Sequence, residues 1–417
     1  MKSASRVRVK KSEIITIGNE ITTGRIVDTN TSAIARYLFK RGYDVTRNIS
    51  VGDRSADITS TLRQSIKRAG LVVVTGGLGP THDDITKKTL CRFFKCGTRL
   101  NPTVMRQLER RFRLYGRKMP EMGRQYAYIP TAAVPIENKM GVAPGLFFKK
   151  KVLVMPGVPI EMEAMLVGLH KLIPHGGLHV REKTLNVCHI SEPGLVEKMT
   201  SLNDVLKKAE VAFLPRHGRV AVRIITKSAN ARRAAAALRS AEKELRKNIE
   251  EYIWGTDDET LEEIAGNLLR SGGKTVAVAE SCTGGGIGKC ITSIAGSSDY
   301  FLGGVIAYSD EVKVKELGVP RGLLKKHGAV SKNTAAAMAR GARKKFGADY
   351  GLSATGVAGP GGGTKEKPVG LIWIALSGPN GGRTKRLQLP HDRNANREWT
   401  IFEALHLLLK EFRAGLR

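Results

Sequence analysis

The sequence is poor in cysteine, in aromatic residues and in long apolar runs. Five cysteines among 417 residues are too few and too scattered for a disulfide framework, and none of them forms a CxxC pair. No apolar run approaches the roughly 18 residues that a membrane span needs, and the basic segment before Glu13 lacks the apolar core of a signal peptide. We therefore expect a reducing, cytoplasmic location and no membrane partner.

Acidic residues are scarce relative to basic ones. The chain has 69 Lys and Arg against 38 Asp and Glu, a formal net charge of +31. Such an excess attracts nucleic acid or phosphorylated small molecules, although a solvated basic surface is the plain alternative. Aromatic residues make up only 6% and form no RNP-like platform, so we expect nucleic-acid binding to be nonspecific if it occurs.

The length predicts two or three domains, and we divide the chain into 1–170, 171–254 and 255–417. The first and last stretches alternate strand-like and helix-like segments, which predicts α/β folds with a parallel sheet covered by helices on both faces. The middle stretch predicts a helix over 194–209, then two strands and a long helix over 231–251. It resembles a small βαββα module of the KH type, although it has no GXXG clamp.

The strongest chemical signal follows an apolar strand that ends at Glu280. Ser281 stands on the expected strand-to-helix turn, followed by Cys282, Thr283 and three glycines. A hydroxyl on such a turn is exposed at the sheet edge, and the N–H groups of the next turn favour an oxyanion or a phosphate. Two alternatives remain: Ser281 is a plain helix N-cap, or Cys282, whose ordinary role would be a buried thiol, is the nucleophile.

Two later segments offer partners for a nucleophile. Tyr308 and Lys313 follow an apolar strand, and a lysine can act as a base where burial lowers its pKa towards neutrality. Lys313 could equally be one solvated lysine among many. A strand that reaches Ser353 is followed by Thr355 and a glycine-rich loop, which either lines a pocket or is a flexible turn.

A similar strand, glycine loop and helix pattern occupies residues 71–90. Its glycines form a loop that can accept an anion. Thr81 and Asp84 have the spacing of a capping box, and carboxylates in a first helical turn complement the helix dipole. The alternative is that Asp83 and Asp84 hold a divalent metal beside a phosphate.

The C-terminal motifs resemble the C-terminal domain of the CinA family (competence/damage-inducible protein A). The resemblance rests on AESCTGG, on GSSDYFLGG followed by AY and K, on GAVS, and on ATGVAGPGGGTKEKPVG. That domain is similar to nicotinamide-nucleotide amidase, which hydrolyses nicotinamide mononucleotide to nicotinate mononucleotide and ammonia in pyridine-nucleotide recycling. The resemblance implies a cofactor-free Ser/Lys hydrolase with Ser281 as nucleophile, Lys313 as base, Tyr308 as relay and Thr355 at the active centre. It implies substrate-binding positions at Thr283, Gly284, Gly285 and Gly356, with Arg397, which we prefer, or Arg393 holding the phosphate.

The N-terminal motifs resemble the MoaB/MogA-like, molybdopterin-binding-like domain of the same family. They are IGNEITTGRIVDTN, VGD, VTGGLGPTHDD, GVAPG and MPGVPIEM. The resemblance implies a three-layer α/β/α fold, a homodimer, and either a molybdopterin-binding module or an ADP-ribose pyrophosphatase that uses Co²⁺ or Mg²⁺. It places metal ligands at Asp83 and Asp84, and a nucleotide pocket at Glu20, Asn30, Asp53, Gly76, Gly77, Thr81, Pro156, Gly157 and Glu161.

Two positions depart from the family pattern. Asn19 stands where the family often has an acidic residue, which weakens a metal site there. Residues 189–194 are HISEPG where the family commonly has a glycine-rich GIGES, so only Glu192 matches. Three functions therefore compete: an amidohydrolase of nucleotide recycling, a nucleotide pyrophosphatase or molybdopterin-binding module, and a nucleic-acid-binding protein linked to competence or DNA damage.

Overall fold

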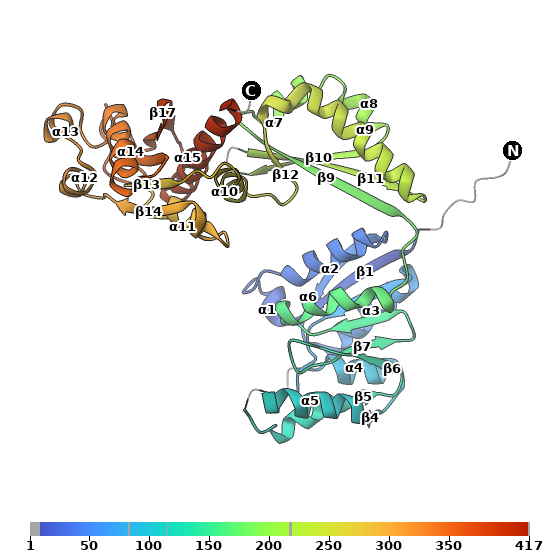
Figure 1. The fold of residues 1–417 in the computed structure, drawn as a ribbon. Coiled ribbons are helices and arrows are strands. Elements are labelled where there is room, and N and C mark those ends of the chain that lie inside the picture. Colours follow the sequence, from blue (N-terminus) through green and yellow to red (C-terminus); the bar gives the residue numbers. More distant parts are fainter. Residues whose placement is uncertain (1–8, 82–83, 115, 217–218, 416–417) are drawn as a thin grey trace. The chain divides into compact units, whose positions relative to one another are not determined.

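The computed structural model describes residues 9–81, 84–114, 116–216 and 219–415 (Figure 1). The chain divides into two compact units, one of Met1–Glu182 with Ile225–Ser240 and the other of Lys183–Ile224 with Ala241–Arg417. Among the described residues, no helix is both long enough and apolar enough to cross a bilayer.

The first unit contains a six-stranded sheet in the order β2-β1-β3-β8-β7-β6. β1, β2, β3 and β8 are parallel, whereas β7 and β6 are antiparallel additions. The reversal follows from a tight turn, because Lys149 and Lys150 take left-handed φ values of 46° and 53° between β7 and β8. The sheet is thus mixed rather than wholly parallel. The strands are β1 (Lys11–Ile17), β2 (Asp44–Val51), β3 (Leu71–Thr75), β6 (Ala133–Ile136), β7 (Gly145–Phe148) and β8 (Val152–Met155).

Helices cover both faces of this sheet, which confirms the three-layer α/β/α prediction. Because side chains alternate along a strand, Val72 and Val74 of β3 enter one core with α3, α4 and α5, whereas Leu71 and Val73 enter the other with α2 and α6. The helices are α1 (Asn19–Thr22), α2 (Thr29–Lys40), α3 (Ser55–Arg68), α4 (Thr86–Phe93), α5 (Pro102–Leu114) and α6 (Pro159–Gly168). A two-stranded ladder of β4 (Thr98–Leu100) and β5 (Tyr128–Pro130) and the 3-10 helix η1 (Glu121–Ala127) complete this region.

The middle stretch forms a four-stranded sheet in the order β10-β11-β9-β12. The single helix expected over 194–209 is wrong: the chain forms α7 (Glu192–Lys198) and α8 (Leu202–Leu206) instead. The helix breaks at Thr200 and Ser201, where hydroxyl residues compete with the helical backbone, and Ser201 Oγ donates to Asn248 Oδ1 at 3.3 Å. The remaining elements are β9 (His179–Cys188), β10 (Glu210–Arg216), β11 (Arg219–Ser228), α9 (Ala231–Ile249) and β12 (Ile253–Thr256).

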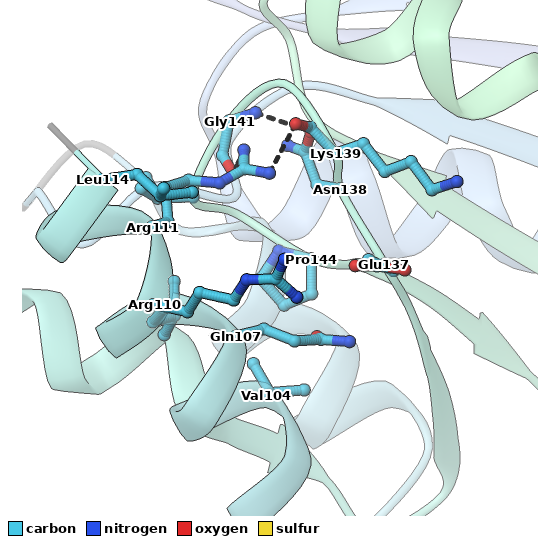
Figure 2. Close-up of a pocket in the computed structure, with 12 residues that line it drawn as sticks. Val104, Gln107, Arg110, Arg111, Leu114, Glu137, Asn138, Lys139, Gly141 and Pro144 are labelled. Atoms are coloured by element: carbon cyan, nitrogen blue, oxygen red, sulfur yellow. Dashed lines mark hydrogen bonds between the residues drawn. The ribbon is translucent and has the colours of Figure 1, made fainter.

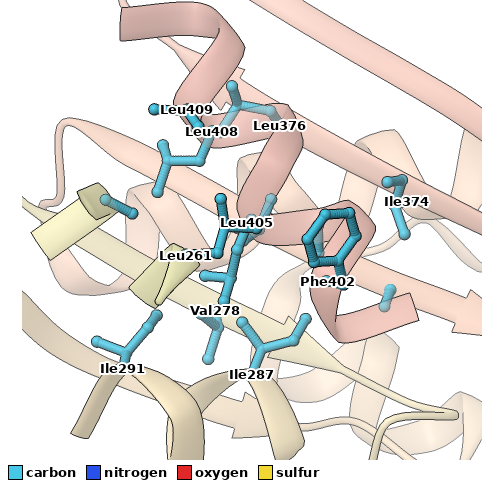
Figure 3. Packing of buried hydrophobic residues seen from close by; sticks show 14 of the residues in the cluster. Leu261, Val278, Ile287, Ile291, Ile374, Leu376, Phe402, Leu405, Leu408 and Leu409 are labelled. Atoms are coloured by element: carbon cyan, nitrogen blue, oxygen red, sulfur yellow. The ribbon is translucent and has the colours of Figure 1, made fainter. Parts of the chain in front are cut away.

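The C-terminal sheet has the order β14-β13-β15-β16-β17, with β13 parallel to both of its neighbours and the last two strands antiparallel. Val276 and Val278 of β13 pack with α10, α11 and α15 (Figure 3), while Ala277 and Ala279 face α12 and α14. The strands are β13 (Val276–Glu280), β14 (Phe301–Ile306), β15 (Tyr350–Gly356), β16 (Leu371–Gly378) and β17 (Gly381–Gln388). The helices are α10 (Leu261–Ser271), α11 (Gly286–Thr292), α12 (Asp310–Leu317), α13 (Arg321–His327), α14 (Lys332–Phe346) and α15 (Arg393–Gly415).

One buried ion pair ties the first strand of the sheet to a covering helix. Glu13 of β1 is fully buried, and both of its carboxylate oxygens accept hydrogen bonds from Arg68 of α3, at 2.7 and 2.8 Å. These hydrogen bonds from Arg68 hold the pKa of Glu13 below its ordinary value. The ionised carboxylate is therefore part of the folded state.

We predict that Glu13→Gln lowers the free energy of unfolding by about 1–3 kcal/mol, because it removes a charged, buried hydrogen-bond acceptor. Since the folded pKa of Glu13 is depressed, its contribution is present above about pH 4.3, the ordinary Glu value, and is lost as the pH falls below it. Urea unfolding from pH 7 to pH 3 measures this. Asp57→Asn, which breaks the exposed Arg54–Asp57 pair, is the control and should cost less than about 1 kcal/mol. Equal losses for both variants would contradict the prediction.

Candidate functional site

The three C-terminal motifs meet at one edge of the sheet. The parallel register places Glu280 of β13 opposite Ile306 of β14 on one side and Ala354 of β15 on the other. Beyond this level the Ala307 N–H donates to the Glu280 carbonyl at 2.7 Å, and the Ser281 N–H donates to the Ala354 carbonyl at 3.0 Å. Ser281 thus lies between the segment that carries Tyr308 and the end of β15, where ligands of such sheets bind.

Ser281 is not a helix N-cap. The following helix, α11, begins only at Gly286, and its N-cap is Gly285. Gly284 and Gly285 take left-handed φ values of 59° and 90°, which L-residues with a side chain adopt at a cost, and this turn separates the serine from the helix. Capping therefore does not explain Ser281, whose side chain is nearly buried.

Cys282 is a poor alternative nucleophile. Its side chain is only 6% exposed, and burial raises the pKa of the thiol to about 12. The reactive form of cysteine is the thiolate, and so high a pKa leaves almost none of it at neutral pH.

Glu280 has a role that the sequence analysis missed. It is 1% exposed, and its carboxylate accepts hydrogen bonds from the N–H groups of Ile287 at 3.0 Å and Gly288 at 2.8 Å. The start of α11 is therefore already occupied by a carboxylate, and these two N–H groups are not open to a phosphate. The available signal was an acidic residue at the end of an otherwise apolar strand.

Lys313 is buried, not solvated. It is 1% exposed, and its Nζ donates to the Tyr308 carbonyl at 3.2 Å and lies 3.5 Å from Asp310 Oδ1. No hydrogen bond joins Lys313 to Ser281 in the part of the chain that the structure describes. Lys313 lies on α12, the helix that follows β14, and β14 is the strand next to β13.

The other predicted residues of this site differ in their exposure and in their hydrogen-bond partners. Tyr308 is 66% exposed, while Thr355 is buried and donates through Oγ1 to the Ala329 carbonyl at 2.9 Å. Gly356 packs so closely against β16 that a Cβ at this position would overlap Ile372. Thr283 is fully buried, and its Oγ1 has no hydrogen-bond partner among the described residues.

Both candidate phosphate-binding arginines lie in the first turns of α15. Arg397 Nη2 donates to the Thr283 carbonyl at 2.8 Å, whereas Arg393 Nη1 donates to the Gly359 carbonyl at 2.7 Å and its Nη2 lies 3.5 Å from Tyr308 Oη. Asn396, which the sequence analysis did not select, is fully buried. Its Nδ2 donates to the carbonyls of Ala358 at 3.1 Å and His391 at 2.8 Å, so it anchors the start of α15 to the loop after β15.

In the first unit, Asn30 joins two strand ends. Its Nδ2 donates to Thr75 Oγ1 at 3.1 Å and to the Gly157 carbonyl at 2.7 Å, and Thr75 Oγ1 donates to the Pro156 carbonyl at 2.9 Å. Asp28 caps α2 by accepting from the Thr31 N–H at 2.9 Å, and Asn30 lies in the first turn of the helix. Asn30 is thereby free to point inward. Its Oδ1 is buried and has no partner among the described residues.

The glycines after β3 are required by close packing. Gly76 and Gly77 have φ values of 109° and 64°. A Cβ on Gly76 would overlap the Ile17 carbonyl oxygen, and a Cβ on Gly77 would overlap Thr86 Oγ1. The loop therefore passes directly over the end of β1 and the start of α4. Thr86 Oγ1 is buried there without a hydrogen-bond partner in the described part of the chain.

The capping-box prediction for Thr81 and Asp84 is wrong, because α4 begins at Thr86 rather than next to Thr81. Asp84 instead closes a loop, in which its Oδ2 accepts from the Thr81 hydroxyl and, at 3.3 Å, from the Thr81 N–H. Asp83, the other predicted metal ligand, lies outside the described residues.

Three further acidic positions of the predicted nucleotide pocket differ in their surroundings. Asp53 pairs with Asn19: the Asn19 N–H donates to Asp53 Oδ2 at 2.9 Å, and the Asp53 N–H donates to Asn19 Oδ1 at 3.1 Å. Glu20 is exposed on α1. Glu161 of α6 lies elsewhere and accepts from Asn138 Nδ2 at 2.7 Å. Burial, reinforced by the charges of Asp84 and Glu161, raises the pKa of Tyr126.

A cavity of about 260 Å³ adjoins Asn138 (Figure 2). Arg111 of α5 spans it and donates to the carbonyls of Lys139 and Gly141. The cavity is lined by Val104, Gln107, Leu108, Arg110, Arg111, Leu114, Glu137, Asn138, Lys139, Gly141, Val142 and Pro144.

The described residues of the first unit include no group of three Asp, Glu, His or Cys side chains close enough to share an ion. Of the two predicted metal ligands only Asp84 lies in the described part of the chain, and it supplies one carboxylate. That number suits Mg²⁺ held jointly by protein and substrate phosphates, and it does not suit an all-protein metal cage.

Family models match three consecutive stretches of the chain. Residues 13–175 match the "Probable molybdopterin binding domain", residues 182–255 the "Damage-inducible protein CinA KH domain", and residues 258–412 the "CinA C-terminal domain". A CinA-like protein of Cytophaga hutchinsonii is 40% identical over 409 residues, covering 96% of this chain and 98% of that protein. The chain belongs to the CinA family.

A second relative agrees with this assignment to the CinA family. A CinA-like protein of Kosmotoga olearia is 38% identical over 400 residues, and the match covers 95% of this chain and 97% of the length of that protein. Among solved structures, the competence/damage inducible protein CihA of Agrobacterium tumefaciens is 39% identical, with a TM-score of 0.35, and covers 36% of this chain and 94% of its own. The protein CinA from Thermoplasma acidophilum is 37% identical, with a TM-score of 0.37, and covers 40% of this chain and 98% of its own.

Proposed function

We propose that the C-terminal domain hydrolyses the carboxamide of nicotinamide mononucleotide to nicotinate mononucleotide and ammonia. The observation that carries the proposal is the position of Ser281 on a glycine turn between two strand ends, with a buried lysine, Lys313, on the helix that follows the neighbouring strand. The resemblance of the motifs to nicotinamide-nucleotide amidase supports the choice of substrate. No cofactor is needed for this reaction.

The chemistry is an acyl transfer to serine. Lys313 Nζ accepts the proton of Ser281 Oγ as the oxygen attacks the carboxamide carbon, and Tyr308 assists the transfer. N–H groups of the turn after Ser281 stabilise the oxyanion. The amine leaves as ammonia with the proton from Lys313, and water then hydrolyses the acyl-serine ester with Lys313 again acting as base.

Arg397 is the better candidate for the substrate phosphate. Its guanidinium lies over the glycine turn, 3.3 Å from the point where a side chain at Gly284 would begin. Because Glu280 occupies the first-turn N–H groups of α11, a charged side chain has to supply the attraction that the helix start would otherwise give.

We predict that Ser281→Ala abolishes ammonia release from nicotinamide mononucleotide, whereas Cys282→Ala retains most of it. The serine oxygen forms the acyl bond, and the thiol is buried and protonated. A coupled ammonia assay on the full chain measures both. Loss of activity in Cys282→Ala, with activity retained in Ser281→Ala, would reverse the assignment of the nucleophile.

The same assay tests the proposed base. Lys313→Met keeps the length of the side chain and should lower kcat about as far as Ser281→Ala, and the double variant should be no slower, because residues that act as a unit are not additive. Lys315→Met, on the same helix, is the matched control and should keep wild-type activity.

We predict that Arg397→Ala raises KM for nicotinamide mononucleotide by more than tenfold, the equivalent of losing about 1.5–3 kcal/mol from a hydrogen bond to a charged group. It should leave the much slower hydrolysis of nicotinamide riboside, which lacks the phosphate, nearly unchanged. Arg393→Ala is the parallel variant, and a larger effect of Arg393→Ala on the nucleotide alone would move the phosphate contact to that residue.

A second candidate function belongs to the first unit, which we propose hydrolyses the pyrophosphate of ADP-ribose. The observation that favours a ligand there is the buried Oδ1 of Asn30, which has no partner among the described residues, at the joined ends of β3 and β8. A nucleotide hydroxyl or N–H could donate to it. A divalent cation would neutralise charge on the phosphates, with Asp84 as the described carboxylate able to hold it.

We predict that Asp84→Asn lowers ADP-ribose hydrolysis in the presence of Co²⁺ or Mg²⁺ at least tenfold, because it removes one of few available carboxylates. Asp57→Asn is the control, because it removes an exposed carboxylate that pairs only with Arg54 in the described structure, and it should keep the wild-type rate. Detection of AMP by chromatography measures both variants. Equal rates for wild type and Asp84→Asn would remove Asp84 from the chemistry.

A further inference from the structure

A cysteine and two histidines converge in the second unit, far from the serine turn in the sequence. Cys188 ends β9, His189 follows it, and His406 lies on α15. Cys188 Sγ is 3.3 Å from His189 Nδ1 and 3.8 Å from His406 Nε2, and the three ligand atoms all lie within 4.8 Å of one another. We propose that these three side chains bind one borderline-soft divalent cation of the Zn²⁺ type.

The spacing of the donors suits a tetrahedral ion. With a Zn–S bond of about 2.3 Å and Zn–N bonds of about 2.0–2.1 Å, neighbouring ligand atoms lie roughly 3.3–3.6 Å apart. The two sulfur–nitrogen distances of 3.3 and 3.8 Å bracket this range. Thiolate and imidazole donors select Zn²⁺ or Co²⁺ over Mg²⁺ or Ca²⁺, which prefer oxygen.

The Glu403 carboxylate contacts the ring nitrogen of His189 that would point away from the ion. His189 Nε2 lies 2.8 Å from Glu403 Oε1, so the ring can donate its Nε2 proton to Glu403 and leave the Nδ1 lone pair directed to the ion. Glu403 is itself held by Lys385, whose Nζ donates to Oε2 at 2.7 Å. Metal-binding histidines ordinarily have an outer partner of this kind, which fixes the orientation of the ring.

The backbone at His189 is unusual in a way that brings the ring into the cluster. Its φ of 62° is left-handed, a conformation that favours glycine, yet the position carries an imidazole. Cys188 and His406 are 2% and 5% exposed, whereas the His189 side chain is 31% exposed and opens the cluster to solvent. An ion can therefore enter past His189, with water as the fourth ligand.

Binding is a simple exchange without redox chemistry. The cation forms one bond to sulfur and two to nitrogen, the thiol proton is released to solvent, and the histidines bind in their neutral form. The bond to His406 then joins the end of β9 to α15. The alternative is a metal-free cluster in which the thiol and the imidazoles only hydrogen-bond to one another.

Co²⁺ titration of the full chain, purified under reductant and stripped with a chelator, separates these alternatives. We expect a thiolate-to-cobalt charge-transfer absorption that saturates at one equivalent per chain, is displaced by Zn²⁺, and disappears in Cys188→Ser. Cys96→Ser and Cys290→Ser are the matched controls and should keep the absorption. Ions held by carboxylates in the first unit do not give this signal, so the test is independent of either proposed activity.

Two further variants keep the test decisive if Cys188→Ser does not fold. His189→Gly, which relieves the left-handed backbone, should fold and yet lose the absorption. Glu403→Gln should keep it but bind Co²⁺ about 10–100-fold more weakly. Absence of the absorption in the wild-type chain, or its persistence in both Cys188→Ser and His189→Gly, would overturn the site.

Discussion

The hydrogen bonding of β13 on both sides is the constraint on which the candidate amidase site depends. The Glu280 carbonyl accepts from the segment after β14, the Ser281 N–H donates to β15, and the Glu280 carboxylate accepts from the first turn of α11. One strand end thus sets the position of the serine relative to three other segments. Parallel strands make this possible because their carboxyl ends share one edge of the sheet.

In the candidate site, a glycine turn and an arginine side chain take the place of a helix start as the groups that would bind an anion. Gly284 and Gly285 carry the chain through a left-handed turn, and Arg397 reaches across it to the Thr283 carbonyl. Since Glu280 already satisfies the start of α11, the positive charge beside the turn comes from a side chain. The buried Asn396 fixes the helix from which that side chain projects.

Much of the fold was predictable, because strand and helix periodicity and glycine turns are local in the sequence. Leu71–Thr75 and Val276–Glu280 are buried strands as expected. The errors arose where a nearby polar side chain competed with the local pattern. Thr200 and Ser201 divide a predicted helix, and Thr81 with Asp84 closes a loop instead of capping a helix. The left-handed backbone of Lys149 and Lys150 forms a tight turn, so β7 pairs antiparallel with β8 in a sheet that was predicted to be parallel.

The sequence by itself determined the succession of α/β segments, the serine on a glycine turn and the membership of that turn in a recognisable motif. Only the tertiary structure decided which distant groups complete a site. The burial of Lys313, the contact of Arg397 with Thr283 and the meeting of Cys188 with His406, 218 residues apart, depend on how strands pair and helices pack. Residue order does not encode such contacts directly, because side chains far apart in the chain meet only when a shared core brings their elements together.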